Sequence, residues 1–302
     1  LNPSSAASDV YKRQVMLLQD ALENNWLTPE DKPIRALDAM CSTGVRIRRW
    51  RNEIPNSLQS RLRITGNDLN DFALSWAINS HRTNLPQYTE NIEMNLDRYG
   101  SMAQRIPVDG IYLQKMDAKL AMADASYQWI DIDPFGSPVA FIDSAIQSLA
   151  RTGVLEVTAT DTAALTGSSS SSQKRRYAAK GIVDDYAHDD AVRVLLGLIA
   201  KTAAMHDRVI KPIMALFDGH HVRVSVLIKS SKEEASNFQD SIGWRLRCEE
   251  IPYKFVRYPN QEQVDSASGP LWIGPLMDKE IAGRMTIETV SYTHLRAHET
   301  RI

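Results

Sequence analysis

Short hydrophobic runs alternate along the chain with longer stretches in which apolar residues recur every three or four positions. The short runs are typical of buried strands, and the longer stretches are typical of amphipathic helices. Such alternation predicts an α/β fold built on a mostly parallel sheet. The expected strands are residues 34–40, 62–65, 111–116, 129–133, 154–160, 209–217 and 220–226. The expected helices are residues 15–27, 45–51 and 185–205, and one that Asn70 or Asp71 caps.

The last two predicted strands form a pair of a different kind. Asp218-Gly219 lies between them, and Asp-Gly between two hydrophobic runs signals a tight hairpin. A hairpin pairs its strands antiparallel, so the sequence predicts a mostly parallel seven-stranded sheet with an antiparallel last strand. His220 and His221 would point to opposite faces of such a strand, so we do not expect them to share a metal ion.

The stretch from Trp129 to Pro138 ends a strand with an unusual set of residues. Asp133 follows a buried apolar run, and Pro134 ends that run because proline cannot donate a ladder hydrogen bond. Ser137-Pro138 has the form of a helix N-cap followed by proline at the first helical position. Asp133 is therefore expected at the carboxyl edge of the sheet, where open α/β sheets bind their ligands.

Asp133 and Phe135 have an ordinary interpretation and a functional one. In the first, Asp133 caps a turn and Phe135 belongs to the core. We favour the second, because acid, proline, aromatic and glycine rarely follow one another at a strand end. A carboxylate here suits methyl transfer to an exocyclic base nitrogen, whose lone pair needs a hydrogen-bond acceptor and a counter-charge. Phe135 would stack on the extruded base.

Four predicted strands end in a carboxylate. These residues are Asp68, Asp117, Asp133 and Asp161. A single strand-end aspartate commonly caps a helix, and that is the alternative for each of them. Because parallel strands end at a common edge, four such residues together would form a rim suited to hydroxyls, amines and a cationic ligand.

The loop after the first strand narrows the choice of ligand. It has the single glycine Gly44 and lacks the Gly-x-Gly-x-x-Gly pattern that admits a pyrophosphate, which counts against NAD or FAD. Asp68 still fits a contact with ribose hydroxyls. A ribose without a pyrophosphate points to S-adenosylmethionine, and Asp117 would then reach the adenine amine.

A serine-rich segment at residues 167–172 precedes a basic triplet. The serines predict a flexible stretch, and Lys174, Arg175 and Arg176 are candidates for phosphate contacts beside the predicted catalytic edge. The alternative is a solvated linker before a charged helix start. The net charge of the chain is −2, so a nucleic-acid partner would have to bind a local basic patch.

The two cysteines and the hydropathy of the chain predict the cellular compartment of the protein. Cys41 and Cys248 are far apart and form no metal-binding motif, which favours a reducing compartment and predicts no metal site. No stretch has the length of a membrane span, so no membrane partner is expected. We therefore expect a cytoplasmic protein, or a nuclear one if the source is a eukaryote.

Both ends of the chain differ from the rest. Residues 1–14 and 290–302 carry no periodicity that a core could use, and both resemble translated adapter read-through, so we expect non-native or disordered ends. Residues 15–231 then form one domain. From about residue 232 basic and aromatic residues gather, and residues 232–289 are expected to form part of a second, incomplete α+β domain.

Several short segments occur together in one known family. They are Asp38-Ala39, residues 42–46, Asn67-Asp68, Asp117-Ala118, residues 131–138, residues 157–161, Arg176-Tyr177 and residues 269–276. Through them the chain, from about residue 15 to 285, resembles the archaeal and eukaryotic tRNA guanine-26 N2-dimethyltransferases. The resemblance implies a Rossmann-like class I methyltransferase domain followed by a C-terminal domain that helps to hold tRNA.

The resemblance also implies an activity and a set of site residues. The reaction would transfer methyl groups from S-adenosylmethionine to N2 of guanine 26 in tRNA, after the base is extruded. The expected catalytic residues are Asp133 and Phe135, and the expected cofactor-binding residues are Asp38, Gly44, Arg46, Asp68, Asp117 and Ala118. The expected substrate-binding residues are Pro134, Asp161, Lys174, Arg175 and Arg176.

Three other functions are compatible with parts of this pattern. An amino-methyltransferase for another RNA or for DNA would use the same acid, proline and aromatic at a strand end. A nucleotide-dependent oxidoreductase shares the sheet, but the missing glycines and the hairpin speak against it. A tRNA-binding remnant without catalysis is the third, because the family's N-terminal Asn-Arg-Asp segment is missing where residues 1–14 stand.

Overall fold

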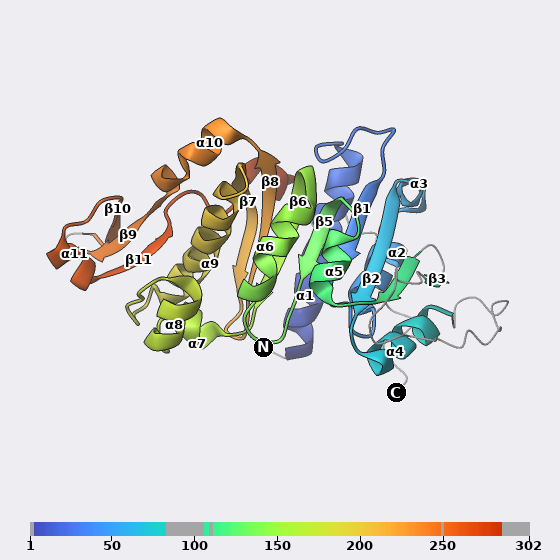
Figure 1. Ribbon diagram of the computed structural model, residues 1–302, viewed down its shortest axis with the longest axis horizontal. Helices are drawn as coiled ribbons and strands as arrows, with labels where there is room; N and C mark the ends of the chain where they lie inside the picture. Colours follow the sequence, from blue (N-terminus) through green and yellow to red (C-terminus); the bar gives the residue numbers. More distant parts are fainter. Residues whose placement is uncertain (1–2, 83–105, 109–110, 249–250, 286–302) are drawn as a thin grey trace.

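A large mixed sheet forms the centre of the protein (Figure 1). The computed structural model describes residues 3–82, 106–108, 111–248 and 251–285. In spatial order the strands are β3 (Ile106–Val108), β4 (Ile111–Lys115), β2 (Leu62–Asp68), β1 (Ile34–Asp38), β5 (Tyr127–Ile132), β6 (Leu149–Ala159), β8 (Val222–Ser230) and β7 (Arg208–Phe217). Strands β4, β2, β1, β5 and β6 are parallel, and β8 is antiparallel to both β6 and β7. The predicted fold class is confirmed, and β3, antiparallel to β4, is an additional edge strand.

Helices cover both faces of this sheet and bury two hydrophobic cores. One face carries α1 (Pro3–Glu23), α2 (Val45–Glu53), α3 (Asn56–Gln59), α4 (Asp71–Arg82) and α12 (Lys279–Arg284). The other carries α5 (Ala118–Ala123), α6 (Val139–Ser148), α7 (Thr162–Leu165), α8 (Ser170–Tyr177) and α9 (Ala187–Ala204). Side chains alternate along the strands, so Trp129 joins the first core and Ile130 the second. Within the described residues no helix is both long and apolar enough to cross a membrane.

The hairpin predicted from Asp218-Gly219 is confirmed, although β8 begins later than expected. Asp218 Oδ1 accepts hydrogen bonds from the backbone N–H groups of His220 and His221, at 3.0 and 2.9 Å. These bonds hold both histidines in the turn, so the strand starts at Val222.

The prediction for the first helix was wrong at its N-terminus. Helix α1 begins at Pro3 rather than at residue 15, so residues 3–14 are helical and not a disordered end. Gln14 is buried, and its side-chain amide donates to Asp131 in the centre of the sheet. Gln14 and Leu18 lie four residues apart, one above the other on the same helix face, which extends the buried stripe toward the N-terminus.

Two expectations around α8 also differ from the structure. The serines were predicted to be flexible, yet Ser170–Ser172 form the first turn of α8. Gln173, fully buried, donates from Nε2 to the carbonyl of Leu165 and so fixes the helix. Ser137 does not cap α6, which starts at Val139 after Pro138; instead its Oγ lies 3.1 Å from the hydroxyl of Tyr177.

A second, antiparallel sheet lies beside α9 (Figure 1). Its order is β10 (Tyr253–Val256), β9 (Ile242–Arg247) and β11 (Ala267–Trp272), with α10 (Lys232–Ser236), η1 (Phe238–Ser241) and α11 (Gln261–Asp265) as connections. Strand β11 approaches α9 so closely that a Cβ on Gly197 would lie 3.3 Å from the backbone nitrogen of Trp272. Helix α12 then returns to the first core, where Ile281 packs and Arg284 pairs with Asp20.

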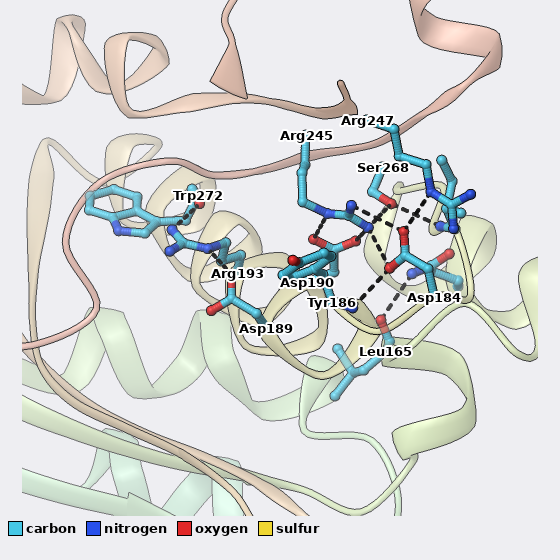
Figure 2. Close-up of polar contacts among 12 residues, drawn as sticks. Leu165, Asp184, Tyr186, Asp189, Asp190, Arg193, Arg245, Arg247, Ser268 and Trp272 are labelled. Carbon is cyan, nitrogen blue, oxygen red and sulfur yellow. Dashed lines mark hydrogen bonds and ion pairs between the residues drawn. The ribbon is translucent and has the colours of Figure 1, made fainter. Parts of the chain in front are cut away.

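A buried arginine fastens the small sheet to the rest of the molecule (Figure 2). Arg245 on β9 is inaccessible to solvent and donates to both carboxylate oxygens of Asp190 on α9, each at 2.7 Å. It also donates to Asp184, at 3.0 and 3.2 Å. Arg193 adds a second attachment, donating to the carbonyl of Trp272 at 3.1 Å. Paired, planar hydrogen bonds of this kind fix orientation as well as distance.

Arg245→Met is expected to lower the free energy of unfolding by about 3–5 kcal/mol, because it leaves Asp190 buried without its cation. Urea denaturation at pH 7 measures this loss. Arg257→Met is the matched control, since Arg257 and Asp240 pair on the surface with side chains 53% and 60% exposed, and such pairs contribute about 0–1 kcal/mol. An equal loss of unfolding free energy in the two variants would contradict the conclusion that the buried pair of Arg245 and Asp190 fastens the small sheet.

Candidate active site

The aspartates predicted at strand ends follow the parallel strands and so belong to the same edge of the sheet. Asp68 ends β2, Asp117 follows β4, Asp133 follows β5 and Asp161 follows β6. Strands β2 and β4 are direct neighbours, as are β5 and β6. The edge therefore has two parts, one around β2 and β4 and one around β5 and β6.

The first part presents two carboxylates beside a tight turn. Asp68 accepts hydrogen bonds from the backbone N–H groups of Ser42 and Asn70, both at 2.8 Å. Asp117 caps α5 by accepting from the N–H of Lys119, and Ala118 behind it is buried. Gly44 begins α2 at φ 77°, a backbone conformation that favours glycine. Asp68 and Asp117 each retain acceptor capacity toward solvent.

The second part lies above a buried row of three acids, of which only Asp38 was predicted from the sequence to have a role in the site. Asp38, Asp131 and Glu156 occupy matching positions on the adjacent strands β1, β5 and β6. All three side chains are inaccessible to solvent. Their signal in the sequence is an isolated charge within an apolar run, but only the pairing of the strands reveals that they form a row.

Two arginines lie within this row. Arg46 on α2 reaches Asp38 at 3.3 Å and Asp131 at 3.1 Å through Nη1, and it pairs with Asp133 through Nη2. Arg223 on β8 pairs with Asp131 and lies 3.0 Å from Glu156. Each arginine thus bridges neighbouring acids, which offsets the repulsion that buried carboxylates at adjacent positions would otherwise feel.

The prediction that Arg46 contacts the cofactor remains a prediction. Its guanidinium lies among carboxylates, with Cζ 5.3 Å from the centre of the Tyr11 ring. Its Nε atom is buried and has no partner within the described residues. Asp38, also predicted to bind the cofactor, is buried and pairs with Arg46 inside the sheet, and its contact with the cofactor likewise stays a prediction.

The row of acids shifts several pKa values. Burial, reinforced by neighbouring acids and opposed by the arginines, raises the pKa of Asp38 and of Glu156 to about 7. Burial alone would raise the pKa of Asp133 as well, but Arg46 and Arg223 outweigh it and lower that pKa below its ordinary value. Asp133 is therefore an anion at neutral pH.

Asp133 also faces open space. A cavity of about 120 Å³ lies beside it, between α1 and the ends of β5, β6 and β8. Its lining residues are Tyr11, Arg46, Asp133, Thr158, Thr160, His221 and Arg223. The side chain of Asp133 is 30% exposed, and its Oδ1 atom makes no hydrogen bond within the part of the chain described here. One carboxylate oxygen is thus available to a ligand.

The turn that follows Asp133 holds Phe135 outside the core. Pro134 is buried, whereas Phe135 is fully exposed, so the alternative that placed Phe135 in the core was wrong. Gly136, at φ 88°, donates to the hydroxyl of Thr160 at 2.6 Å and accepts from its backbone N–H at 2.9 Å. These bonds tie the turn to the end of β6 and present the aromatic ring to solvent.

Asp161 links the predicted catalytic edge to the basic helix α8. Its Oδ1 accepts from the hydroxyl of Tyr177 at 2.7 Å, and its Oδ2 accepts from Arg176 at 2.9 Å. Lys174 and Arg175 do not contact it, and both are exposed. The structure thus brings Arg176 to the predicted edge and leaves the other two basic residues on the solvent side of α8.

Glu156→Gln tests the buried row through the pH dependence of stability. The folded protein holds the Glu156 proton more tightly than the unfolded chain, so the wild type loses stability as the pH rises from about 4.5 to about 7. Glutamine mimics the protonated acid, so the variant should gain up to about 3 kcal/mol relative to wild type over that interval. Urea denaturation at pH 5 and pH 8 measures the change.

Glu233→Gln on α10 is the control for this measurement. Its side chain is exposed. The difference in free energy of unfolding between this variant and wild type should be the same at pH 5 and pH 8. If the difference in free energy of unfolding between Glu156→Gln and wild type is also the same at pH 5 and pH 8, Glu156 is ionised over that whole range. Its pKa would then not be raised.

The fold and one family model identify the family of this chain. The sheet has parallel strands from β4 to β6, and β8, antiparallel to both its neighbours, lies between β6 and β7. With helices on both faces, this is the fold of class I methyltransferases. The model of the N2,N2-dimethylguanosine tRNA methyltransferase family matches residues 9–302, a span that includes residues 9–14 and 290–302, which the sequence pattern assigned to foreign ends. The chain belongs to this family.

Curated relatives and a solved structure agree with that assignment. A tRNA (guanine(26)-N(2))-dimethyltransferase of Thermococcus kodakarensis is 32% identical over 251 residues, which cover 82% of this chain and 63% of the relative. One from Metallosphaera sedula is 32% identical, covering 87% and 64%. The structure of Trm1 from Pyrococcus horikoshii with S-adenosyl-L-methionine superposes with a TM-score of 0.74 at 26% identity, covering 92% of this chain and 70% of that one. The chain spans less than two thirds of the length of these two curated relatives.

Proposed function

We propose that this protein is an S-adenosylmethionine-dependent methyltransferase that methylates N2 of guanine 26 in tRNA. The observation that carries the proposal is Asp133, an anionic carboxylate at the carboxyl edge with one oxygen turned toward a cavity. The names of the relatives support tRNA and guanine as the substrate. From the same residue the sequence predicts methyl transfer to an exocyclic base nitrogen, and the family resemblance implies that the base is guanine 26.

The proposed cofactor site lies around β2 and β4. Carboxylates suit the polar groups of S-adenosylmethionine, because Asp68 can accept from ribose hydroxyls and Asp117 from the adenine amine. Ala118 and Gly44, which have no side chain larger than a methyl group, are proposed to lie against the ligand. The bound cofactor supplies an electrophilic methyl carbon on its sulfonium. Asp38 acts only indirectly in this scheme, by holding Arg46 in place.

The proposed role of Asp133 is to accept a hydrogen bond from the guanine amine through Oδ1. This draws the nitrogen lone pair out of conjugation with the ring and stabilises the positive charge that develops as the nitrogen is methylated. Because its pKa is lowered, Asp133 stabilises this charge better than it would hold the departing proton. The proton then passes to solvent.

The turn after Asp133 is proposed to receive the base. N2 of a paired guanine is inaccessible inside a helix, so the base must be extruded before transfer. Phe135, held outside the core, offers an aromatic face for stacking, and Pro134 fixes the distance between that face and Asp133. Stacking of the base on this fully exposed ring would remove apolar surface of both from water.

Helix α8 is the proposed contact for the tRNA backbone. Lys174, Arg175 and Arg176 fill its last turn and are exposed, which suits phosphates. Both oxygens of Asp161 are occupied, by Arg176 and by Tyr177. Because the Asp161 side chain is only 8% exposed, it is proposed to contribute to substrate binding by fixing Arg176 rather than by contacting RNA.

The wild-type protein should incorporate methyl groups from radiolabelled S-adenosylmethionine into a tRNA transcript that carries guanine 26. Replacing that guanine with adenine removes the acceptor amine and should remove the incorporation. Equal incorporation into both transcripts would assign the activity to another nucleotide, and incorporation into DNA alone would assign it to another substrate class.

Asp133→Ala is expected to lower kcat by about 10²- to 10⁴-fold, because the amine loses its acceptor in the transition state. The affinity for S-adenosylmethionine, measured by calorimetry, should change by less than about threefold, since Asp133 lies on the base side of the edge. Asp143→Ala on α6 is the matched control, because Asp143 is exposed and pairs with His206 away from the edge. Loss of cofactor binding in Asp133→Ala with full activity in Asp143→Ala would contradict the proposed role.

Changing Lys174, Arg175 and Arg176 together to alanine should weaken tRNA binding and reduce the slope of log Kd against log salt by about 2–3. The control triple variant is Lys201→Ala, Lys229→Ala and Lys232→Ala, whose side chains are exposed near the opposite edge of the sheet. Filter binding at several salt concentrations measures both. A wild-type slope in the α8 variant would remove this helix from the RNA contact.

A further inference from the structure

A larger cavity lies apart from the catalytic edge, between α8 and the small sheet. Its volume is about 530 Å³, within the range of about 300–1,000 Å³ that is usual for ligand sites. It is lined by Ser170, Ser171, Lys174, Ala178, Ala179, Lys180, Trp244, Gly269 and Pro270. Of the residues in the proposed function only Lys174, a tRNA contact, lines it, so binding of the cofactor and of the target base does not explain the cavity.

The walls of this cavity are fixed. Lys180 and Gly269 exchange two backbone hydrogen bonds, at 2.8 and 2.7 Å, which join the segment after α8 to β11. The small sheet is held to α9 by Arg245 and Asp190, as Figure 2 shows. Gln173 fastens α8 from its buried side. The cavity is therefore present before any ligand arrives, which lowers the cost of binding.

Two side chains give the cavity its chemistry. Trp244 on β9 is half-buried and lies against Gly269, where a Cβ would come within 2.8 Å of its ring. Lys174 is exposed at the cavity and forms no ion pair or hydrogen bond with any residue that the structure describes. Its neighbour Lys180 is occupied, since Nζ donates to the carbonyl of Asp265 at 2.6 Å. An aromatic face beside an unpaired cation suits a ligand that has a flat ring and a phosphate.

Helix α8 connects this cavity to the catalytic edge. Ser170, Ser171 and Lys174 lie at helical spacing on the cavity side, and Ala178 directly follows the helix. Tyr177, near the C-terminal end of the same helix, reaches Asp161 and Ser137 at the edge. A polynucleotide held at the edge therefore needs to cross only the width of one helix to reach the cavity.

We propose that this cavity binds a second, unpaired nucleotide of the substrate RNA, with its base against Trp244 and its phosphate at Lys174. The inference rests on the proposed function, which supplies an RNA at the neighbouring edge. The cavity would hold the RNA while the target base enters the site beside Asp133. It is a recognition site and takes no part in methyl transfer.

Trp244→Leu removes the stacking face and is expected to raise Kd and KM for the tRNA transcript by about 5- to 100-fold, the effect of losing one base–aromatic stack. At saturating tRNA, kcat should stay within about twofold of wild type, and the affinity for S-adenosylmethionine should not change. Trp244→Phe keeps an aromatic face and should restore Kd and KM to within about threefold of wild type. Unchanged Kd and KM in Trp244→Leu would overturn the inference.

Ser171→Leu tests the cavity without altering the small sheet. Ser171 is exposed on α8, so a leucine there should fill space in the cavity while the protein still folds, and it should raise KM for tRNA as Trp244→Leu does. Thermal melting by circular dichroism checks folding of each variant. If the wild type methylates the tRNA but both variants bind and methylate it as well as wild type, only this inference fails. If the wild type binds the transcript without methylating it, the proposed function fails, and Kd still tests the cavity.

Discussion

The candidate site depends on the two arginines that bridge a row of buried acids. Pairing of β1 with β5 and of β5 with β6 brings Asp38, Asp131 and Glu156 into line, where burial and mutual repulsion both oppose ionisation. Arg46 and Arg223 each bind the middle acid and one neighbour, so neither could be lost without leaving charge uncompensated. Arg46 also binds Asp133. The ionisation state of the proposed catalytic carboxylate is thus set by the interior of the sheet, and not only by the solvent-facing edge.

Much of the fold and one side of the site could be predicted because the relevant signals are local. Strand runs, the hairpin at Asp218 and the strand-end position of Asp133 are all encoded within about ten residues. The acid row could not be predicted in the same way, because it exists only once three distant strands adopt a particular register. An isolated charge in an apolar run, such as Glu156, signals a buried partner but does not identify it.

The wrong predictions share a physical cause, which is that tertiary contacts outweigh local propensity. Five serines favour flexibility in isolation, but one buried hydrogen bond from Gln173 anchors α8. The segment before residue 15 has weak periodicity, yet Gln14 meets a buried acceptor in Asp131. In both cases a single glutamine inside a polar stretch makes the contact. A glutamine in a polar stretch without an apolar stripe can therefore indicate a buried hydrogen bond that fixes the segment.

Selection of the proposed RNA substrate would have to be short-ranged, because a chain with a net charge of −2 produces no broad attractive field for RNA. Attraction would instead be concentrated on α8, whose basic last turn lies between the edge at Asp161 and the cavity at Trp244. The two proposed base sites, one on either side of this helix, would favour an RNA that presents two unpaired bases at the matching separation. A regular duplex, which has charge but no available bases, could satisfy only the helix between them. Shape and base exposure, rather than charge, would then decide which RNA is methylated.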